Sequence, residues 1–279
     1  CVDIGLDLAT LIDPAHGQAD AWMLERADIE KWRPFVPGDA AKWNRGHVAI
    51  IAGGGASVLA AHGAFRGGAG LVTLLAPKGD WESLHGLWPE VILAEPEDLE
   101  AQRHNVVVIG PGLGTDEAQA RQVLELWNTW PGAVVADADA LTVLAAHPHE
   151  VHTPSGSIRV ITPHSAEAAR LLNGTRQDIE QDRYTAVRRL SGYGVAVLKG
   201  PYTLIGPNRV WINPTGSPKL ATAGTGDVLA GMIGGCIAAG AGPQEAAAVC
   251  VWNHGLAGSR MPDGGTASDL IAALLPGGK

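Results

Sequence analysis

The segment Gly224-Thr225-Gly226-Asp227 holds the residues whose types and spacing are best suited to chemistry. Two glycines around Thr225 allow successive backbone N–H groups to point at one anion, and the helix predicted from the following apolar residues adds its positive end. Asp227 falls in the first turn of that helix. The helix dipole keeps its carboxylate ionised there, as a base acting on a hydroxyl beside a bound phosphate requires. An acidic residue at a helix start is ordinary, but the two glycines favour an anion-binding loop.

Glycines and polar residues that could bind a ligand also follow five short apolar runs, each typical of a buried strand. They are Gly53–Gly55, Gly110–Gly114, Asp137–Asp139, Thr162–His164 and Lys199–Gly200. The carboxyl ends of parallel strands meet at one edge of a sheet, so we expect these groups to form one nucleotide-sized site. An unpaired lysine after a buried strand is costly, so a phosphate or carboxylate partner is expected for Lys199.

The elements that position these groups alternate along the chain. Strands are predicted at Val48–Ala52, Leu71–Ala76, Val106–Ile109, Ala133–Ala136, Ile158–Ile161 and Val195–Leu198. Helices are predicted at Ala56–Arg66, Asp116–Trp127, Ser165–Leu172, Asp178–Leu190, Asp227–Ala239 and Gln244–Leu256. Several strands are apolar on both faces, which indicates an α/β fold whose central, mostly parallel sheet carries helices on both faces. Residues 1–34 form a lead-in segment that ends at Arg33–Gly38, and residues 35–279 form the α/β domain.

The composition excludes several classes of protein. Of the 279 residues, 37 are glycine without a Gly-X-Y period, 46% are hydrophobic and 18% are charged, which excludes collagen and a disordered chain. The net charge of −9 argues against a nucleic-acid partner bound through a basic face. No stretch approaches the roughly 20 apolar residues of a membrane span, so no membrane partner is expected. Neither the Gly-x-Gly-x-x-Gly dinucleotide fingerprint nor the P-loop pattern is present.

Cysteine and histidine usage predicts the compartment and argues against a metal centre. The three cysteines form no Cys-x-x-Cys pair, and Cys236 and Cys250 lie in apolar helical patterns, as in a cytoplasmic protein. The chain begins at Cys1 rather than at a methionine, so the possibility of a preceding targeting segment or domain stays open. His147, His149 and His152 lie between prolines without helical spacing, so we expect a solvated loop and no metal ligands there.

Glycines inside the helix that follows Asp227 have a different interpretation. Gly231, Gly234, Gly235 and Gly240 each cost up to about 1 kcal/mol relative to alanine in a helix. We therefore expect them to permit close packing rather than to contact a ligand.

Together the motifs resemble a known family. Gly224–Asp227 is similar to the loop of the ribokinase-like superfamily, whose aspartate at this place is the catalytic base. The ordered set closely resembles the ADP/ATP-dependent NAD(P)H-hydrate dehydratase family, the carbohydrate-kinase-like domain of nicotinamide-nucleotide repair, from about residue 35 to about residue 275. It comprises Lys42–Val48, Gly68–Val72, Trp88–Glu90, Gly110–Gly114, Asp137–Leu141, Thr162–Glu167, Val197–Gly200 and Asn213–Gly216.

The resemblance implies a ribokinase-like fold and the repair of NADH or NADPH hydrated at C6, in the S form. A nucleotide, ADP or ATP, phosphorylates the C6 hydroxyl, and phosphate then departs. Asp227 takes the hydroxyl proton, while Gly224, Thr225 and Gly226 stabilise the transferring phosphoryl. Nucleotide binding is implied for Lys199, Gly200, Pro201, Tyr202, Thr203 and Gly226, and binding of the hydrated dinucleotide for Ala56, Gly112, Gly114, Asp139, His164 and Asp227.

The resemblance also implies cofactors and partners. Mg²⁺ is expected to enter with the nucleotide, held by phosphates and water rather than by protein ligands. The partners are the small-molecule substrate and further copies of the chain in a homo-oligomer, a tetramer in this family. A separate NAD(P)H-hydrate epimerase is expected to supply the S form, because only Val2–Leu6 resembles the epimerase domain that many members carry.

The sequence departs from the family pattern at three places. A longer loop with an aromatic residue is usual where Gly53–Ala56 runs almost straight into a helix, and Ala223 and Leu220 stand where glycine and methionine are usual. Two alternatives stay open. One is a ribokinase-like kinase of a vitamin precursor, against which Thr162–His164 and Asn213–Gly216 argue. The other is a non-catalytic nucleotide-binding protein, which only the altered loop supports.

Overall fold

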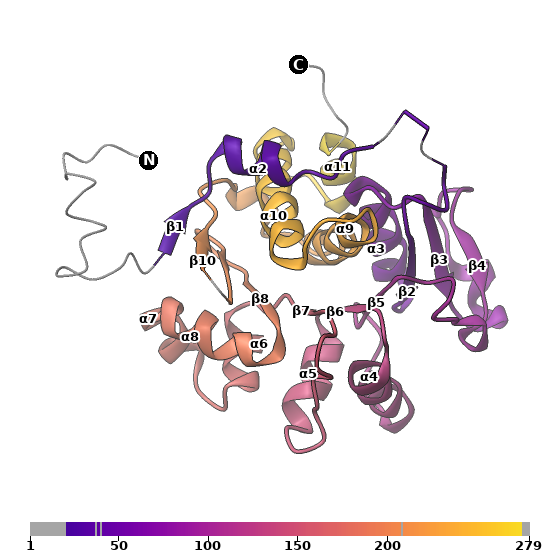
Figure 1. Cartoon of the computed structure of the whole chain (residues 1–279), viewed down its shortest axis with the longest axis horizontal. Coiled ribbons are helices and arrows are strands. Elements are labelled where there is room, and N and C mark those ends of the chain that lie inside the picture. The colour runs from indigo at the N-terminus through magenta and orange to yellow at the C-terminus, as the bar shows by residue number, and fades with distance from the viewer. Residues whose placement is uncertain (1–20, 37, 40, 208, 275–279) are drawn as a thin grey trace.

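The computed structural model describes residues 21–36, 38–39, 41–207 and 209–274, so the Val2–Leu6 segment lies outside it. Ten strands of these residues form one sheet in the order β1-β10-β9-β8-β7-β6-β5-β2-β3-β4 (Figure 1). The strands are β1 (Ala21–Met23), β2 (His47–Ile51), β3 (Leu71–Leu75), β4 (Ile92–Ala94), β5 (Val106–Ile109), β6 (Ala133–Ala136), β7 (Arg159–Ile161), β8 (Val195–Leu198), β9 (Leu204–Ile205) and β10 (Val210–Ile212).

The sheet is mostly parallel, as predicted. Within the set β2 to β8, neighbouring strands pair in parallel; Val108, for example, lies opposite Val135 on one side and Ile50 on the other. Strand β9 runs antiparallel to both β8 and β10, and β1 pairs in parallel with β10 at the edge. The six predicted strands are confirmed within one residue at each end. The short strands β1, β4, β9 and β10 were not predicted.

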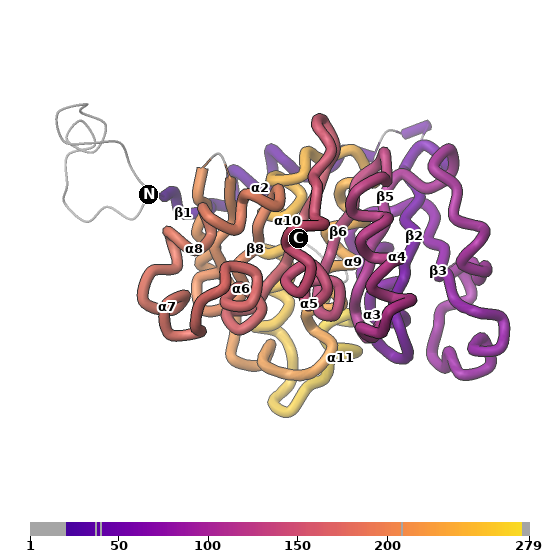
Figure 2. Tube along the Cα trace, turned by 90° about the horizontal axis from the view of Figure 1, so that it is seen from below, coloured from indigo at the N-terminus to yellow at the C-terminus, as the bar shows by residue number. Residues whose placement is uncertain are grey.

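Helices cover both faces of the sheet, which confirms the predicted layers (Figure 1). One layer holds α2 (Arg26–Trp32), α3 (Gly54–Gly67), α9 (Thr225–Ala238), α10 (Pro243–Arg260) and α11 (Ala267–Ala273). The other holds α4 (Glu117–Thr129), α5 (Asp139–Ala146), α6 (Ser165–Leu171), α7 (Arg176–Gln181) and α8 (Arg183–Leu190). Figure 2 looks onto the second layer and shows α4, α5 and α6 side by side across the sheet. Short 3₁₀ turns lie at Lys78–Ser83, Pro96–Asp98, Ser191–Tyr193 and Pro218–Leu220.

Each strand contributes to two hydrophobic cores because successive side chains point to opposite faces. Val48, Ile50 and Val108 belong to the core under α3 and α9, whereas Val107 and Ile109 belong to the core under α4 and α5. Burial on both faces explains why the strands read as continuous apolar runs. Among the described residues, no helix combines the length and the apolar character needed to cross a bilayer.

Glycines bring α3 and α9 into backbone contact. A Cβ atom on Gly63 or Gly67 of α3 would collide with a carbonyl oxygen of α9, and one on Gly231 or Gly235 of α9 would collide with a carbonyl oxygen of α3. Gly234 faces the sheet instead, where a Cβ atom would lie 2.5 Å from the Val108 side chain. The close-packing prediction is therefore confirmed for Gly231, Gly234 and Gly235.

The same prediction is wrong for Gly240. It lies beyond the end of α9, has a φ of +99° and has no heavy atom within 4 Å of a Cβ position. Its N–H donates to the Ile237 carbonyl and that of Ala241 donates to Cys236, which closes the helix in a Schellman motif. The left-handed conformation of this C-terminal turn requires the glycine, not helix packing.

The predicted helix Asp178–Leu190 is two helices, α7 and α8. Asp182 separates them with a φ of −141° and a ψ of 76°, and its carboxylate accepts the Thr185 N–H to cap α8. The described part of the lead-in segment packs on the domain: Leu24 and Ile29 are buried in the core that α10 shares. The division of the chain at residue 34 stays a prediction.

Arg159, at the start of β7, is a buried cation that donates hydrogen bonds to four carbonyl oxygens and lies over the Trp127 ring. Its guanidinium donates to the carbonyls of Trp127 and Trp130 at 2.8 Å, Gly132 at 3.0 Å and Ile158 at 2.9 Å. Burial lowers the pKa of Arg159 to about 10, so the group stays charged at neutral pH. The positive charge lies at the C-terminal end of α4, where the helix dipole favours a cation.

Replacing this guanidinium leaves several buried carbonyls without a donor. We expect Arg159→Met to lower the free energy of unfolding by about 3 kcal/mol or more, measured by urea denaturation. The control Arg121→Met removes an exposed arginine that pairs with Glu117, and we expect a change within about 0.5 kcal/mol. Equal effects of the two substitutions would contradict the structural role of Arg159.

Candidate active site

The first turn of α9, Gly224–Asp227, is the predicted anion-binding turn and lies at the carboxyl edge of the sheet. Gly224 has a φ of +88° and no side chain caps the helix there, so the first N–H groups of α9 face outward from its start. The Thr225 hydroxyl donates to the backbone and lies 2.8 Å from the Leu220 carbonyl and 3.1 Å from that of Thr222. It therefore fixes the shape of the turn rather than facing a ligand.

Asp227 is half-buried among other acids. Burial raises its pKa to about 6, and the nearby carboxylates of Asp137, Asp139 and Glu167 add to the shift, against the opposing effect of Lys199. A carboxylate with this pKa is ionised at neutral pH and still basic enough to accept a proton.

Lys199 directly follows β8 and pairs with a carboxylate, as expected for a lysine after a buried strand. Its Nζ lies 2.8 Å from Asp137 Oδ1 and 4.0 Å from Glu167 Oε2. Burial alone would lower the pKa of Lys199, but the two carboxylates outweigh it and raise the pKa. A Cβ atom on Gly226 would lie 3.3 Å from Nζ, so the ammonium lies directly against the anion-binding turn.

His254 on α10 fixes the first turn of α9 from the other side. Its Nε2 lies 2.9 Å from the Thr225 carbonyl oxygen, which can only accept, so Nε2 carries the proton. Burial lowers the pKa of His254 to about 4, and the ring is neutral at pH 7. The sequence predicts the helix that carries His254, but no local pattern marks its contact with α9.

The Asn213–Gly216 motif is hydrogen-bonded to α10. The buried Asn213 amide donates to the Thr215 carbonyl at 2.8 Å, and the Thr215 hydroxyl donates to the Trp252 carbonyl at 2.9 Å. Lys219 then donates to the Met261 carbonyl at 2.7 Å. These bonds hold the segment that leads into Gly224.

Two glycine loops, one after β2 and one after β5, contact each other. The Gly53 N–H donates to the Pro111 carbonyl at 2.9 Å, and a Cβ atom on Gly112 would lie 2.8 Å from the Gly53 oxygen and 3.3 Å from Ala56. The Gly114 N–H donates to Asp139 Oδ2 at 2.8 Å. Four of the predicted dinucleotide-binding residues, Ala56, Gly112, Gly114 and Asp139, thus belong to one connected surface.

His164 caps α6 with its ring. Its Nδ1 accepts the N–H groups of Ala166 and Glu167 at 3.1 Å, while Glu167 Oε2 accepts the His164 N–H at 2.7 Å. Nδ1 is therefore an acceptor, and Nε2 of the half-exposed ring lies 3.4 Å from Glu167 Oε1. Glu167, which sequence reasoning did not assign to the site, links His164 to Lys199.

The turn between β8 and β9 holds the predicted nucleotide-binding residues. Gly200 has a φ of +144°, and Tyr202 has a φ of +52° with an exposed ring. Arg183 donates to the carbonyls of Leu198 at 3.1 Å and Lys199 at 3.4 Å, which fixes the start of the turn. The Thr203 hydroxyl donates to Gly200 at 3.1 Å. Of the predicted nucleotide-binding residues, Lys199 and Gly226 lie against each other, and the roles of all these residues stay predictions.

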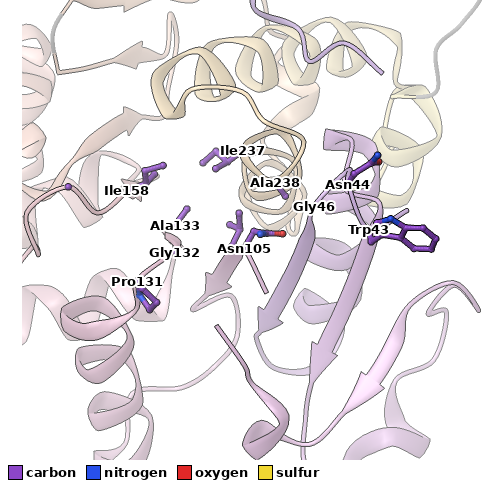
Figure 3. A pocket seen from close by; sticks show the side chains of 12 residues that line it. Trp43, Asn44, Gly46, Asn105, Pro131, Gly132, Ala133, Ile158, Ile237 and Ala238 are labelled. Atoms are coloured by element: carbon purple, nitrogen blue, oxygen red, sulfur yellow. The ribbon is translucent and has the colours of Figure 1, made fainter. Parts of the chain in front are cut away.

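A pocket lies at the opposite edge of the sheet (Figure 3). It measures about 390 Å³ and is lined by residues before β2, at the starts of β5 and β6 and at the end of α9, among them Trp43, Asn105 and Ala238. None of its lining residues is titratable, so it lacks the groups needed for proton or phosphoryl transfer. The chemistry-bearing residues gather at the carboxyl edge instead.

Comparison with known proteins decides the family. Residues 48–275 match the family model described as NAD(P)H-hydrate dehydratase. The chain belongs to the NAD(P)H-hydrate dehydratase family. It is similar to the bifunctional NAD(P)H-hydrate repair enzyme Nnr of Mycobacterium tuberculosis, with 40% identity over 88% of this chain and 50% of the relative. The chain spans about half the length of the curated relatives it matches.

Solved structures of the family share the fold. The ADP/ATP-dependent NAD(P)H-hydrate dehydratase of Bacillus subtilis, co-crystallised with ATP/Mg²⁺, is similar with a TM-score of 0.81, 25% identity, and coverage of 91% of this chain and 96% of that one. A ribokinase-like superfamily protein of Enterococcus faecalis is similar with a TM-score of 0.79, 27% identity, and coverage of 90% and 93%. The family and the ribokinase-like fold expected from the motifs are therefore confirmed.

The neutral His254 makes the stability of this family member depend on pH. Its folded pKa of about 4 lies below the ordinary value of 6.5, so the unfolded chain takes up a proton first and the free energy of unfolding falls as pH falls from about 6.5 to about 4. We expect His254→Leu to remove on the order of 2 kcal/mol of the loss between pH 7 and pH 5, measured by urea denaturation. The exposed His85→Leu is the matched control, and an unchanged pH slope in His254→Leu would contradict the assignment.

Proposed function

We propose that this chain dehydrates NADH or NADPH hydrated at C6 in the S configuration, at the expense of ADP or ATP, and so returns the intact dinucleotide. One observation carries the proposal: a half-buried aspartate and a lysine lie at an uncapped helix start in a chain that belongs to the NAD(P)H-hydrate dehydratase family. Relatives are named for NAD(P)H-hydrate repair, and the Bacillus subtilis enzyme is described as ADP/ATP-dependent.

The reaction has a physical logic. Hydroxide is a poor leaving group, so elimination of water at C6 is slow until the hydroxyl oxygen carries a phosphoryl group. Asp227 takes the proton of that hydroxyl as the oxygen attacks the terminal phosphorus of the nucleotide. The P–O bond to the nucleotide breaks first. The C6–O bond then breaks as inorganic phosphate leaves with the electron pair, a proton is lost from C5 to solvent, and the electrons of that C–H bond form the C5=C6 bond again.

The anion-binding turn stabilises the transferring phosphoryl group. The backbone N–H groups of Gly224, Thr225 and Gly226 are donors fixed before the substrate arrives, so no reorganisation is needed during transfer. The Lys199 ammonium lies beside Gly226 and adds a positive charge at the same place. The positive end of α9 acts in the same direction.

The two substrates occupy opposite sides of this turn. The nucleotide binds along Lys199, Gly200, Pro201, Tyr202 and Thr203 with Gly226, where glycine conformations leave the backbone accessible. The hydrated dinucleotide binds along Ala56, Gly112, Gly114, Asp139 and His164. In the described part of the chain, no three His, Cys, Asp or Glu side chains are grouped to hold a metal ion, so Mg²⁺ is proposed to be held by nucleotide phosphates and water. When bound, Mg²⁺ neutralises phosphate charge.

The setting of the reaction is also a proposal. The thiols of Cys236 and Cys250 are free and buried, which supports a reducing compartment such as the cytoplasm. A homotetramer and a separate epimerase that supplies the S form are supported by the family resemblance alone.

Recovery of NADH tests the proposed function directly. The protein is incubated with (6S)-hydrated NADH, Mg²⁺ and either ADP or ATP, and absorbance at the NADH band is followed over time. We expect absorbance to return with at least one nucleotide and not without nucleotide. No recovery with either nucleotide would reject the proposal.

Removal of the proposed base separates catalysis from binding. We expect Asp227→Asn to lower kcat by about 10²- to 10⁴-fold while the dissociation constant of the nucleotide, measured by calorimetry, stays within about threefold. Asp116→Asn is the matched control, because Asp116 also lies at a helix start and asparagine caps a helix equally well. An active Asp227→Asn enzyme would refute the base role.

The pKa of Asp227 predicts the pH dependence of the reaction. The base works only when ionised, and its pKa is raised to about 6, so kcat/KM is expected to be flat above that pH and to fall about tenfold per unit below it. The profile is measured with saturating nucleotide and limiting hydrate. A fall that begins only near pH 4, the ordinary range of an aspartate, would contradict this assignment.

A further inference from the structure

We propose that Asp137 is a positioning residue that holds the Lys199 ammonium against the anion-binding turn and away from Asp227. The inference rests on the proposed function and concerns a residue to which no role in that reaction was given above. Asp137 follows β6 and Lys199 follows β8, with β7 between the two strands, so the ion pair spans the carboxyl end of a strand.

The position of the ammonium depends mainly on Asp137. Nζ lies 2.8 Å from Asp137 Oδ1, within hydrogen-bond distance, but 4.0 Å from Glu167, which is too far for one. The Asp137 side chain is only 2% exposed, whereas that of Lys199 is 21% exposed. An ammonium has three N–H donors, so the bond to Asp137 leaves others for a phosphoryl oxygen on the open side.

The same contact places the charge at the anion-binding turn. A Cβ atom on Gly226 would lie 3.3 Å from Lys199 Nζ and 3.5 Å from Asp137 Oδ2. Both members of the ion pair therefore border the backbone of the turn, and the absence of a side chain at Gly226 keeps that space open.

Asp137 itself is held rigidly. Its N–H donates to the Ile109 carbonyl at 3.1 Å, and its carbonyl accepts the Ala140 N–H at 3.1 Å. The next residue, Ala138, has a φ of +49° and a ψ of −115°, a conformation that is rare outside glycine and is strained for an alanine. This turn lets Asp137 face Lys199 while Asp139 faces Gly114, so one strained residue directs two carboxylates to different partners.

Without Asp137 the lysine has other carboxylates to approach. The charged groups around Asp227 are Asp137 and Asp139 after β6, Lys199 at the end of β8 and Glu167 on α6, while His254 on α10 contacts the Thr225 carbonyl. A lysine released from Asp137 is drawn to Glu167 or Asp227. Pairing with Asp227 would occupy the base and remove the charge from the phosphoryl site.

The test uses nucleotide affinity, which does not require turnover. Calorimetry with ADP and ATP, each with Mg²⁺, compares the wild type with Asp137→Asn, Lys199→Met and the double variant. Loss of a negative charge alone would tighten binding of an anionic nucleotide, whereas loss of positioning is expected to weaken it about fivefold or more. Because Asp137 acts through Lys199, the double variant should bind no more weakly than Lys199→Met.

Turnover supplies the second readout. In Asp137→Asn the acid limb of kcat/KM is expected to move to lower pH by about half a unit or more, because one like charge is lost and Lys199 approaches Asp227. Asp137→Glu, which keeps the charge, should restore nucleotide affinity in part and leave the limb in place. If Asp137→Asn does not fold, Asp137→Glu is measured in its place. Nucleotide binding by Asp137→Glu as weak as that of Lys199→Met would then count against the proposal.

The outcomes separate the two claims. A wild type that binds nucleotide but never restores NADH would reject the proposed function, while the affinity comparison still decides the role of Asp137. Unchanged or tighter nucleotide binding in Asp137→Asn, or losses that add in the double variant, would overturn the positioning role.

Discussion

Helices α3 and α9 pack with their backbones in contact, and the arrangement of the site depends on that contact. A Cβ atom at Gly63, Gly67, Gly231 or Gly235 would collide with a carbonyl oxygen of the other helix. The close approach brings the start of α9 beside the start of α3, where Leu59 lies against the Gly224 position. The anion-binding turn of one helix therefore lies next to the glycine loop that begins the other. A larger residue at any of the four positions would move the two apart.

Charge balance is the second constraint on the site. Asp137, Glu167 and Asp227 lie around the Lys199 ammonium, and Asp139 lies near Asp227, so negative charge exceeds positive charge among these groups. Burial of unpaired carboxylates is costly, and the raised pKa values of Asp227 and Glu167 express that cost. The backbone N–H groups of α9 offset it in part, since they favour negative charge at the helix start. The raised pKa of the proposed base, Asp227, is thus a consequence of the packing that builds the site.

Local sequence patterns predicted the parts of the fold that local forces determine. Buried parallel strands such as Val106–Ile109 are recognisable as apolar runs. The Gly224–Asp227 turn is recognisable from its two glycines and the acidic residue that follows them. The short strands β4 and β10 carry no comparable pattern, because each pairs with a segment elsewhere in the chain, β4 with β3 and β10 with β1. The helix predicted across Asp182 failed for a similar reason: an aspartate that caps α8 is also acceptable inside a polar helical pattern.

Contacts between distant segments were the part that the sequence did not reveal. A partner was expected for Lys199, but its identity as Asp137 depends on strand order, because the two residues are 62 positions apart in the sequence. The contact of His254 with the Thr225 carbonyl depends on the packing of α10 beside α9. The sequence shows Arg159 only as part of a predicted strand, because its carbonyl partners lie at the end of α4. Gly240 was misread because a terminal glycine and an interior packing glycine look alike in the sequence.

The central claim is that the C6 hydroxyl oxygen is phosphorylated at the start of α9 before it leaves. The most direct measurement follows that oxygen, with (6S)-hydrated NADH that carries ¹⁸O at C6, Mg²⁺ and the active nucleotide in a single turnover. Mass analysis of the released inorganic phosphate is expected to show one ¹⁸O atom per phosphate, because the C6–O bond breaks after the oxygen has joined phosphorus. Unlabelled phosphate, with the ¹⁸O recovered in water, would contradict the account.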